Sequence, residues 1–250
     1  MSVPSLSLEG KVAIVTGGGT GIGRGIALEF AKAGADVVVA SRRLSVLEKV
    51  GEEVTALGNR SLAVRTDISR KTDVDNLVQR VIGEFGGIDI LVNNAGTGVR
   101  ASLLEHSEQD WDTVLDTNLK GYYLCSQAVG RKMVERKRGN IINIASTAAF
   151  RGGSSYNISK AGVVMLTRAL ARELASYNIR VNAVAPGWVK TEMSKAMWSD
   201  PELLKQEEAR IPLRRIGEPS EIGRVAVFLA SGASSYITGQ TIIADGGLLA

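Results

Sequence analysis

Short apolar runs alternate with longer amphipathic segments along the whole chain. Runs rich in valine, isoleucine and alanine, which are typical of strands buried on both faces, lie at residues 11–16, 36–41, 62–66, 89–93, 140–145, 180–185 and 241–244. Helical spacing of apolar residues covers the stretches between them, at 21–33, 45–57, 72–85, 107–136, 155–177 and 221–229. A polar, irregular segment runs from Pro186 to Pro219, and we expect it to contain a mobile helix.

This alternation predicts one α/β domain over residues 1–250. Strands separated by helices pair in parallel, with right-handed crossovers that place helices against the sheet. We expect a doubly wound parallel sheet of about seven strands with helices on both faces. No linker-like stretch or internal repeat divides the chain.

Composition narrows the class of protein without identifying its chemistry. The chain has 250 residues, 44% of them hydrophobic, which is enough to bury one sizeable core. Cys125 is the only cysteine and His106 the only histidine, so the sequence offers no internal disulfide, no cysteine-based metal site and no multi-histidine metal centre. We expect His106 on a surface loop. The sequence has no apolar run near about 20 residues and no export signal, which predicts a cytoplasmic protein without membrane or nucleic-acid partners.

Positive charge is spread along the chain, which has a formal net charge of +4, except at one basic cluster. This cluster consists of Arg131, Lys132, Arg136, Lys137 and Arg138. Such a cluster can dock an acidic partner or a phosphate, but it is more commonly the solvated end of a helix. Both interpretations stay open from the sequence.

A glycine-rich turn follows the first predicted strand. Thr16 is followed by G-G-G-T-G-I-G-R-G, in which Gly17, Gly21 and Gly23 depart from the strict G-x-G-x-x-G spacing. The physical logic of a phosphate site remains, because glycine permits close backbone approach and the next helix presents free N–H groups and its positive dipole end. The turn could serve tight packing alone. Its place after the first buried strand favours a dinucleotide, bound where the strand order of such a sheet reverses.

Ser41, Arg42 and Arg43 stand at the end of the second predicted strand. In dinucleotide folds a carboxylate near this place accepts hydrogen bonds from the adenosine ribose and favours NAD. An arginine instead suits the 2′-phosphate of NADP, to which it donates charge-assisted hydrogen bonds. The alternative is that both arginines merely solvate a loop. We predict that NADP(H) is favoured over NAD(H).

Tyr156 and Lys160 lie four residues apart in a predicted helix, so their side chains share one face. A free phenol has a pKa of about 10, and a nearby ammonium lowers that pKa toward a useful acid/base range. Ser146, at the end of an apolar run, could hold a substrate oxygen beside the phenol. Ordinary amphipathic helices also contain such pairs, so the pair alone is a weak signal.

Together these motifs resemble the short-chain dehydrogenase/reductase family over nearly the whole chain. Their order and spacing are specific although each is modest: Thr16-Gly-x3-Gly21-x-Gly23, Asp67 after the third strand, Asn93-Asn94-Ala95-Gly96 after the fourth, Asn118 in the long helix, Ser146, Tyr156-x3-Lys160, and Pro186-Gly187 followed by Thr191. The resemblance implies a Rossmann-type fold and hydride transfer between C4 of a nicotinamide and a carbonyl carbon or secondary alcohol.

The resemblance also implies a role for each matching residue. Tyr156 would be the general acid/base, Lys160 would lower its pKa and bind the nicotinamide ribose, and Ser146 would position the substrate oxygen. Asn118 would support a proton relay through water. Cofactor binding would involve Gly17, Thr20, Gly21, Ile22, Gly23, Ser41, Arg42, Arg43, Asp67 (against the adenine), Ile68, Asn94, Ala95, Gly96, Tyr156, Lys160, Pro186, Gly187, and Val189 with Thr191 at the nicotinamide carboxamide.

The loop before Tyr156 departs from the family pattern. Only nine residues separate Ser146 from Tyr156, fewer than family members commonly have. If the strand end holds Ser146 in place, the deletion merely shortens the loop beside the substrate pocket. Otherwise Thr147, Ser154 or Ser155 could supply the hydroxyl. Ser146 remains the candidate.

The substrate is less well determined, because one fold serves many chemistries. Residues 111–121 and 126–137 resemble sugar-acid dehydrogenases of the gluconate 5-dehydrogenase type, which predicts a keto sugar acid or a similar small carbonyl compound. The 3-oxoacyl-carrier-protein reductases are nearly as similar, and the basic cluster would suit their acidic carrier protein. A dinucleotide-binding regulator without turnover is a third class, which the retained tyrosine and lysine disfavour.

We expect the substrate pocket to be lined by Arg151, Trp188, Met193 and Met197. Arg151 could meet a substrate carboxylate or could cap a loop. The pocket requires no metal ion.

The resemblance further implies a homotetramer with two-fold symmetry. The predicted helices 107–136 and 155–177 carry more apolar residues than one sheet face is expected to cover, namely Val114, Leu115, Val163, Val164, Leu166 and Leu170. In the family these helices pair across a two-fold axis, and the tail 246–250 would pack against a neighbour.

Overall fold

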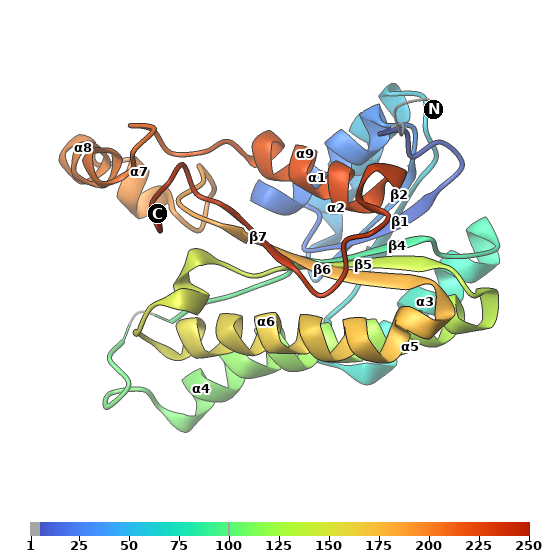
Figure 1. The fold of residues 1–250 in the computed structure, drawn as a ribbon, viewed down its shortest axis with the longest axis horizontal. Coiled ribbons are helices and arrows are strands. Elements are labelled where there is room, and N and C mark those ends of the chain that lie inside the picture. Colours follow the sequence, from blue (N-terminus) through green and yellow to red (C-terminus); the bar gives the residue numbers. More distant parts are fainter. Residues whose placement is uncertain (1–5, 100) are drawn as a thin grey trace.

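The computed structural model describes residues 6–99 and 101–250. Seven parallel strands form one sheet between two layers of helices (Figure 1). The strands in chain order are β1 (Val12–Thr16), β2 (Asp36–Ser41), β3 (Ser61–Arg65), β4 (Ile90–Asn93), β5 (Gly139–Ile144), β6 (Ile179–Pro186) and β7 (Thr241–Ala244). In space they lie in the order β3-β2-β1-β4-β5-β6-β7, so the predicted doubly wound parallel sheet is confirmed.

Helices cover both faces of the sheet (Figure 1). One face carries α1 (Gly21–Lys32), α2 (Leu44–Ala56) and α9 (Pro219–Ala230), and the other carries α3 (Lys71–Phe85), α5 (Gly121–Arg136) and α6 (Ser155–Leu174). The predicted polar segment contains α7 (Lys195–Trp198) and α8 (Pro201–Arg210), which lie beyond one end of the sheet.

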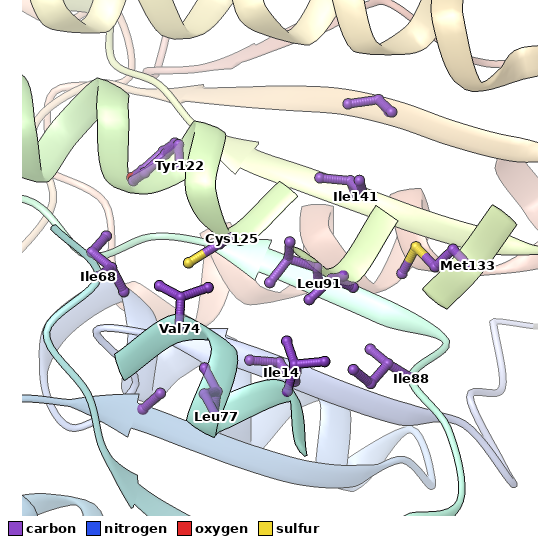
Figure 2. Packing of buried hydrophobic residues seen from close by; sticks show 14 of the residues in the cluster. Ile14, Ile68, Val74, Leu77, Ile88, Leu91, Tyr122, Cys125, Met133 and Ile141 are labelled. Atoms are coloured by element: carbon purple, nitrogen blue, oxygen red, sulfur yellow. The ribbon is translucent and has the colours of Figure 1, made fainter. Parts of the chain in front are cut away.

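Two apolar cores hold these layers together, one on each face of the sheet. All five residues of β1 are buried, and successive side chains point to opposite faces. Ile14 therefore packs toward α3 and α5, as Figure 2 shows, whereas Ala13 and Val15 pack toward α1. Burial on both faces explains why the strands are continuous apolar runs rather than alternating ones.

A buried polar ladder fixes α5 and α6 against the sheet. Asn93 Nδ2, at the end of β4, donates to Ser126 Oγ of α5 and to Asn143 Oδ1 of β5, both at 2.9 Å. Asn143 Nδ2 donates in turn to Thr167 Oγ1 of α6 at 2.9 Å. Because buried polar groups are costly without partners, these bonds set the position of α6, whose first turn carries Tyr156.

The long helix predicted over residues 107–136 is not α-helical throughout. It runs as α4 (Glu108–Leu115), a π-helical turn (Asp116–Lys120) and α5. A π turn accommodates an extra residue and commonly marks a functional site. Here it contains Asn118, which is fully buried.

The prediction of uncovered apolar residues on the second layer is wrong in part. Val114, Val163 and Val164 are buried within the single chain. The apolar side chains left exposed on α4 to α6 include Trp111, Ile158 and Met165 instead. Within the described residues, no helix is both long and apolar enough to cross a membrane.

Candidate active site

A cavity of about 870 Å³ opens at the carboxyl ends of the strands. It spans the ends of β1 and β4, the neighbours at which the strand order reverses, and this is where open α/β sheets bind ligands. Every residue predicted to bind the cofactor lines it, as do Ser146, Arg151, Trp188, Met193 and Met197. Asn118 is the one predicted site residue outside this lining.

The glycine turn after β1 needs its glycines for two separate reasons. Gly17 and Gly21 have positive φ angles of 64° and 52°, which side chains rarely tolerate. A Cβ on Gly23 would lie 2.2 Å from the carbonyl oxygen of Gly17, so no side chain fits there. Thr20 precedes α1 without capping it through its side chain. The free N–H groups at the start of α1 therefore remain available to an anion.

Ser41, Arg42 and Arg43 line the cavity beyond the end of β2. Ser41 Oγ accepts a hydrogen bond from the Arg43 backbone N–H at 3.3 Å, and both arginine side chains are exposed. Asp67, after β3, lines the same cavity. Burial alone would raise the pKa of Asp67, but hydrogen bonds from Ser69 and the charges of Arg42 and Arg70 lower it overall. The charge of Arg42 is thus near enough to lower the pKa of the Asp67 carboxyl.

Tyr156, in the first turn of α6, faces the cavity together with Ser146 from the end of β5. Burial raises the pKa of Tyr156, and a hydrogen bond with the Ser146 side chain partly lowers it again. Burial and Ser146 account for the shift of this pKa, and the lowering by Lys160 stays a prediction.

Lys160 is only 3% exposed. Its Nζ donates to the Ile144 carbonyl oxygen at 2.7 Å and to the hydroxyl of Tyr122 at 3.3 Å. It lies 5.7 Å from the centre of the Tyr156 ring. Burial lowers the pKa of Lys160 to about 7, because an ammonium is less stable away from water.

Ser146 is the hydroxyl that reaches Tyr156 in spite of the shortened loop. Its Oγ also accepts a hydrogen bond from Ala148 N–H at 3.1 Å, so it is held at the start of a 3₁₀ turn. Ser154 bonds Asn157 in the capping box of α6, and Ser155 is fully buried against His106. The shorter loop therefore leaves Ser146 facing Tyr156.

Asn118 holds the loop after β4 instead of facing the cavity. Its Nδ2 donates to the Thr97 carbonyl at 2.8 Å and to Ser159 Oγ at 3.1 Å, while its Oδ1 accepts from Thr97 N–H at 2.8 Å. Both polar atoms of this amide thus have partners within the chain, and its role in a proton relay stays a prediction. Gly96 lies between Asn118 and Lys160, since a Cβ on Gly96 would be 3.4 Å from Asn118 Oδ1 and 3.8 Å from Lys160 Nζ.

The substrate side of the cavity is bounded by contacts between distant segments. Arg151 Nη2 donates to the carbonyl of Leu248 at 3.3 Å, so the C-terminal tail contacts its own chain here. Trp188 Nε1 donates to Glu207 Oε2 of α8 at 2.8 Å. Leu248 itself lines the cavity.

Several supporting residues were not predicted from the sequence. Ser194 accepts from Thr191 N–H at 3.1 Å and donates to the Val189 carbonyl at 2.6 Å, which fixes the loop after β6. His106, expected on a surface loop, is in a loop but only partly exposed, and its Nε2 lies 2.8 Å from Ser155 Oγ. Tyr122 beside Lys160 was missed as well. His106 and Tyr122 have no spacing signal, because their partners are 49 and 38 residues away in the sequence, whereas Ser194 bonds residues only three and five positions before it.

Three of the five residues of the basic cluster form ion pairs with carboxylates of the same chain. Arg136 and Arg138 each approach Asp89 Oδ1 at 3.5 Å, and Lys132 pairs with Glu135 at 2.8 Å. This supports the interpretation that the cluster is a solvated helix end.

Comparisons with known proteins agree with the geometry. A family profile described as Enoyl-(Acyl carrier protein) reductase matches residues 17–249. The 2-dehydro-3-deoxy-D-gluconate 5-dehydrogenase of Escherichia coli (strain K12) is 44% identical, with 100% of each chain covered. The chain belongs to the short-chain dehydrogenase/reductase family. It is therefore an oxidoreductase that acts on alcohol and ketone groups.

Further members of the family match over nearly their whole length. The 3-oxoacyl-(acyl-carrier-protein) reductase FabG of Staphylococcus epidermidis (strain ATCC 35984) is 43% identical over 95% of this chain and 98% of its own. A gluconate 5-dehydrogenase from Burkholderia cenocepacia J2315, solved in complex with NADP and tartrate, superposes with a TM-score of 0.94 at 34% identity. That match covers 100% of this chain and 99% of the other.

Proposed function

We propose that this protein transfers hydride between C4 of NADP(H) and a ketone or secondary alcohol, with Tyr156 as the general acid/base. One observation carries the proposal: a single cavity brings Ser146, Tyr156 and Lys160 together with the glycine turn after β1. Such an arrangement places a proton donor and a dinucleotide site against one substrate position.

The residues present fit a dinucleotide. A Cβ on Gly17 would lie 2.7 Å from the Ala95 backbone and a Cβ on Gly23 2.2 Å from the Gly17 carbonyl oxygen, so this tight turn requires glycine, and the start of α1 offers uncapped N–H groups for a diphosphate. Asp67 and Ile68 would flank the adenine, and Val189 with Thr191 would hold the carboxamide of the nicotinamide. When bound, the cofactor supplies or accepts the hydride.

The chain's own residues would handle the proton. In reduction, Tyr156 would donate its hydroxyl proton to the substrate oxygen, and Ser146 would hold that oxygen by a hydrogen bond. Burial keeps Tyr156 protonated in the free protein, which suits an acid. Lys160 would bind the nicotinamide ribose and stabilise the phenolate that remains.

The proposed preference for NADP(H) rests on Ser41 and Arg42. Both line the cavity where the adenosine ribose would lie, and Ser41 stands in place of a carboxylate. The structure of the relative from Burkholderia cenocepacia contains NADP, which supports a nicotinamide dinucleotide here.

We further propose a keto sugar acid or similar small carbonyl compound as substrate. Arg151 is the cation that lines the substrate side beside Ser146, and it could pair with a carboxylate. The similarity to sugar-acid dehydrogenases supports this choice. A 3-oxoacyl-(acyl-carrier-protein) substrate is the second candidate, favoured by the 43% identity to such a reductase.

A panel of carbonyl compounds tests both candidates with NADPH and NADH. It should include 5-keto sugar acids, acetoacetyl thioesters and diketones. The highest kcat/KM on a 5-keto sugar acid would support the first candidate, and the highest on a thioester the second. No turnover above background with any carbonyl would contradict the proposal and favour a non-catalytic dinucleotide-binding protein.

For assembly we propose a homotetramer. The exposed apolar side chains on α4 to α6, such as Trp111, Ile158 and Met165, offer a face that a second copy would bury. A cytoplasmic location remains a prediction from the sequence.

A further inference from the structure

Tyr122 is a fully buried phenol that the proposed mechanism does not use. Figure 2 shows its ring on α5 among the apolar side chains beside the sheet. Its hydroxyl has polar partners, because it donates to the Ile144 carbonyl oxygen and lies 3.3 Å from Lys160 Nζ. Lys160 donates to the same carbonyl at 2.7 Å. The three groups therefore form a closed triangle, in which Ile144 and Lys160 line the cavity and Tyr122 lies behind them.

The ammonium of Lys160 has no ion pair within the described part of the chain. Besides the two hydrogen bonds of the triangle, it faces two aromatic rings, whose centres lie 5.1 Å away for Tyr122 and 5.7 Å away for Tyr156. A lysine ammonium has three N–H donors. Two are directed to Ile144 and Tyr122, which leaves one for the cavity that Lys160 lines.

We propose that Tyr122 is a positioning residue for Lys160. Its hydroxyl holds the ammonium against the Ile144 carbonyl, so that the remaining N–H points to the cavity. The kinetic consequence rests on the proposed function, whereas the effect on Lys160 itself does not.

A purely apolar role for Tyr122 does not account for its hydroxyl. Phenylalanine would fill the same space in the core without the cost of burying a polar group. The described partners of the hydroxyl are Lys160 and the carbonyl that Lys160 also binds. The next residue, Tyr123, shows the contrast, because it is 46% exposed and its hydroxyl accepts from Gln127.

The hydroxyl also favours the charged form of Lys160. A hydrogen-bond acceptor stabilises an ammonium, and this opposes the burial that lowers the pKa of Lys160. The titratable groups that face the pair are Tyr156 from α6 and Cys125 from α5. The loop 94–99 and the end of β5 contribute no titratable side chain. Loss of the Tyr122 hydroxyl should therefore lower the pKa of Lys160 further.

The test is an NMR titration of the full chain with lysine labelled by carbon-13 at Cε. Lys160→Met assigns the signal, and Tyr122→Phe is compared with the wild type and with Tyr123→Phe as the matched control. We expect the Lys160 titration to move about one pH unit lower in Tyr122→Phe and to stay unchanged in Tyr123→Phe. Because reduction needs Lys160 and Tyr156 protonated, the alkaline limb of kcat/KM should move by the same amount.

Each outcome decides the inference. An unchanged titration in a folded Tyr122→Phe protein, or an equal shift in Tyr123→Phe, would overturn it. A Tyr122→Phe protein that does not fold would overturn it too, since the hydroxyl would then serve the fold instead of Lys160. If the wild type reduces no carbonyl, the proposed function fails, but the NMR titration still tests the role of Tyr122.

Discussion

Two hydrogen bonds between Thr16 and Asn94 join the end of β1 to the end of β4. Asn94 Nδ2 donates to the Thr16 carbonyl oxygen at 2.9 Å, and Thr16 Oγ1 accepts from the Asn94 backbone N–H at 3.0 Å. The two strands are neighbours at the point where the sheet order reverses. The glycine turn and the loop after β4 therefore form one rigid wall of the cavity.

Gly23→Ala should break this wall. Its Cβ would lie 2.2 Å from the Gly17 carbonyl oxygen and 2.5 Å from Asn94 Nδ2, so backbone must move. We expect a loss of about 1–3 kcal/mol of stability and much weaker NADPH binding, measured by fluorescence titration and thermal unfolding. Gly83→Ala on α3 is the control, because its Cβ meets nothing within 4 Å and should slightly stabilise the helix. NADPH binding unchanged in Gly23→Ala would contradict this account of the turn.

Tyr156→Phe should lower kcat by at least about 10²-fold, the usual scale of general acid/base catalysis. The substitution keeps the ring and removes the proton. NADPH affinity should change little, and the exposed Tyr177, substituted by phenylalanine, serves as the control. The measurement is steady-state kinetics with the panel compound that gives the highest kcat/KM. If Tyr156→Phe retains most of its kcat, the proposed mechanism is wrong.

Cofactor choice should follow Ser41 and Arg42. Hydrogen bonds to charged groups contribute about 1.5–3 kcal/mol each, and about 1.4 kcal/mol corresponds to tenfold. One or two such bonds predict roughly a 10- to 1000-fold preference for NADPH in kcat/KM. Ser41→Asp combined with Arg42→Leu should move the preference toward NADH, because it adds a ribose acceptor and repels the phosphate.

Arg80→Leu is the control for charge alone, since Arg80 is exposed on α3 and does not line the cavity. Equal or better efficiency of the wild type with NADH would mean that Arg42 only solvates its loop.

Lys160 should make stability depend on pH. Burial lowers its pKa from 10.5 to about 7, so below pH 7 the fold carries a buried charge at a cost. Between these values the unfolded chain binds a proton that the folded chain does not, and stability rises with pH. Lys160→Met removes this cost. Its advantage over the wild type in urea unfolding should be largest below pH 7 and shrink toward pH 10.5. A difference that does not vary with pH would refute the buried charge.

The protein should sediment as a tetramer at micromolar concentration, at four times the 26.5 kDa of one chain. Burial of the exposed face on α4 to α6 drives the association. Met165→Glu, at a side chain that is 59% exposed in the single chain, should shift the species to lower mass. A wild type that sediments only as the single chain would contradict the prediction.

Local patterns in the sequence were enough for the fold and for most of the cavity lining. Buried strands need continuous apolar runs and amphipathic helices need a 3.6-residue period, so the order of elements is readable without contacts. A parallel sheet places all its strand ends at one edge. The residues after β1, β2, β4, β5 and β6 were therefore predicted to meet, and they line one cavity.

What the tertiary structure alone decided is where each polar atom finds its partner. Tyr156-x3-Lys160 predicts two side chains on one face of α6, but the direction of the ammonium depends on Ile144 and Tyr122, which come from β5 and α5. The direction of the Asn118 amide also depends on distant residues, because it bonds Thr97 and Ser159 and does not line the cavity. The spacing of two residues along the chain determines whether their side chains lie on the same face of a helix. Burial and hydrogen bonding between distant segments determine its charge and its direction, and these exist only once the layers have packed.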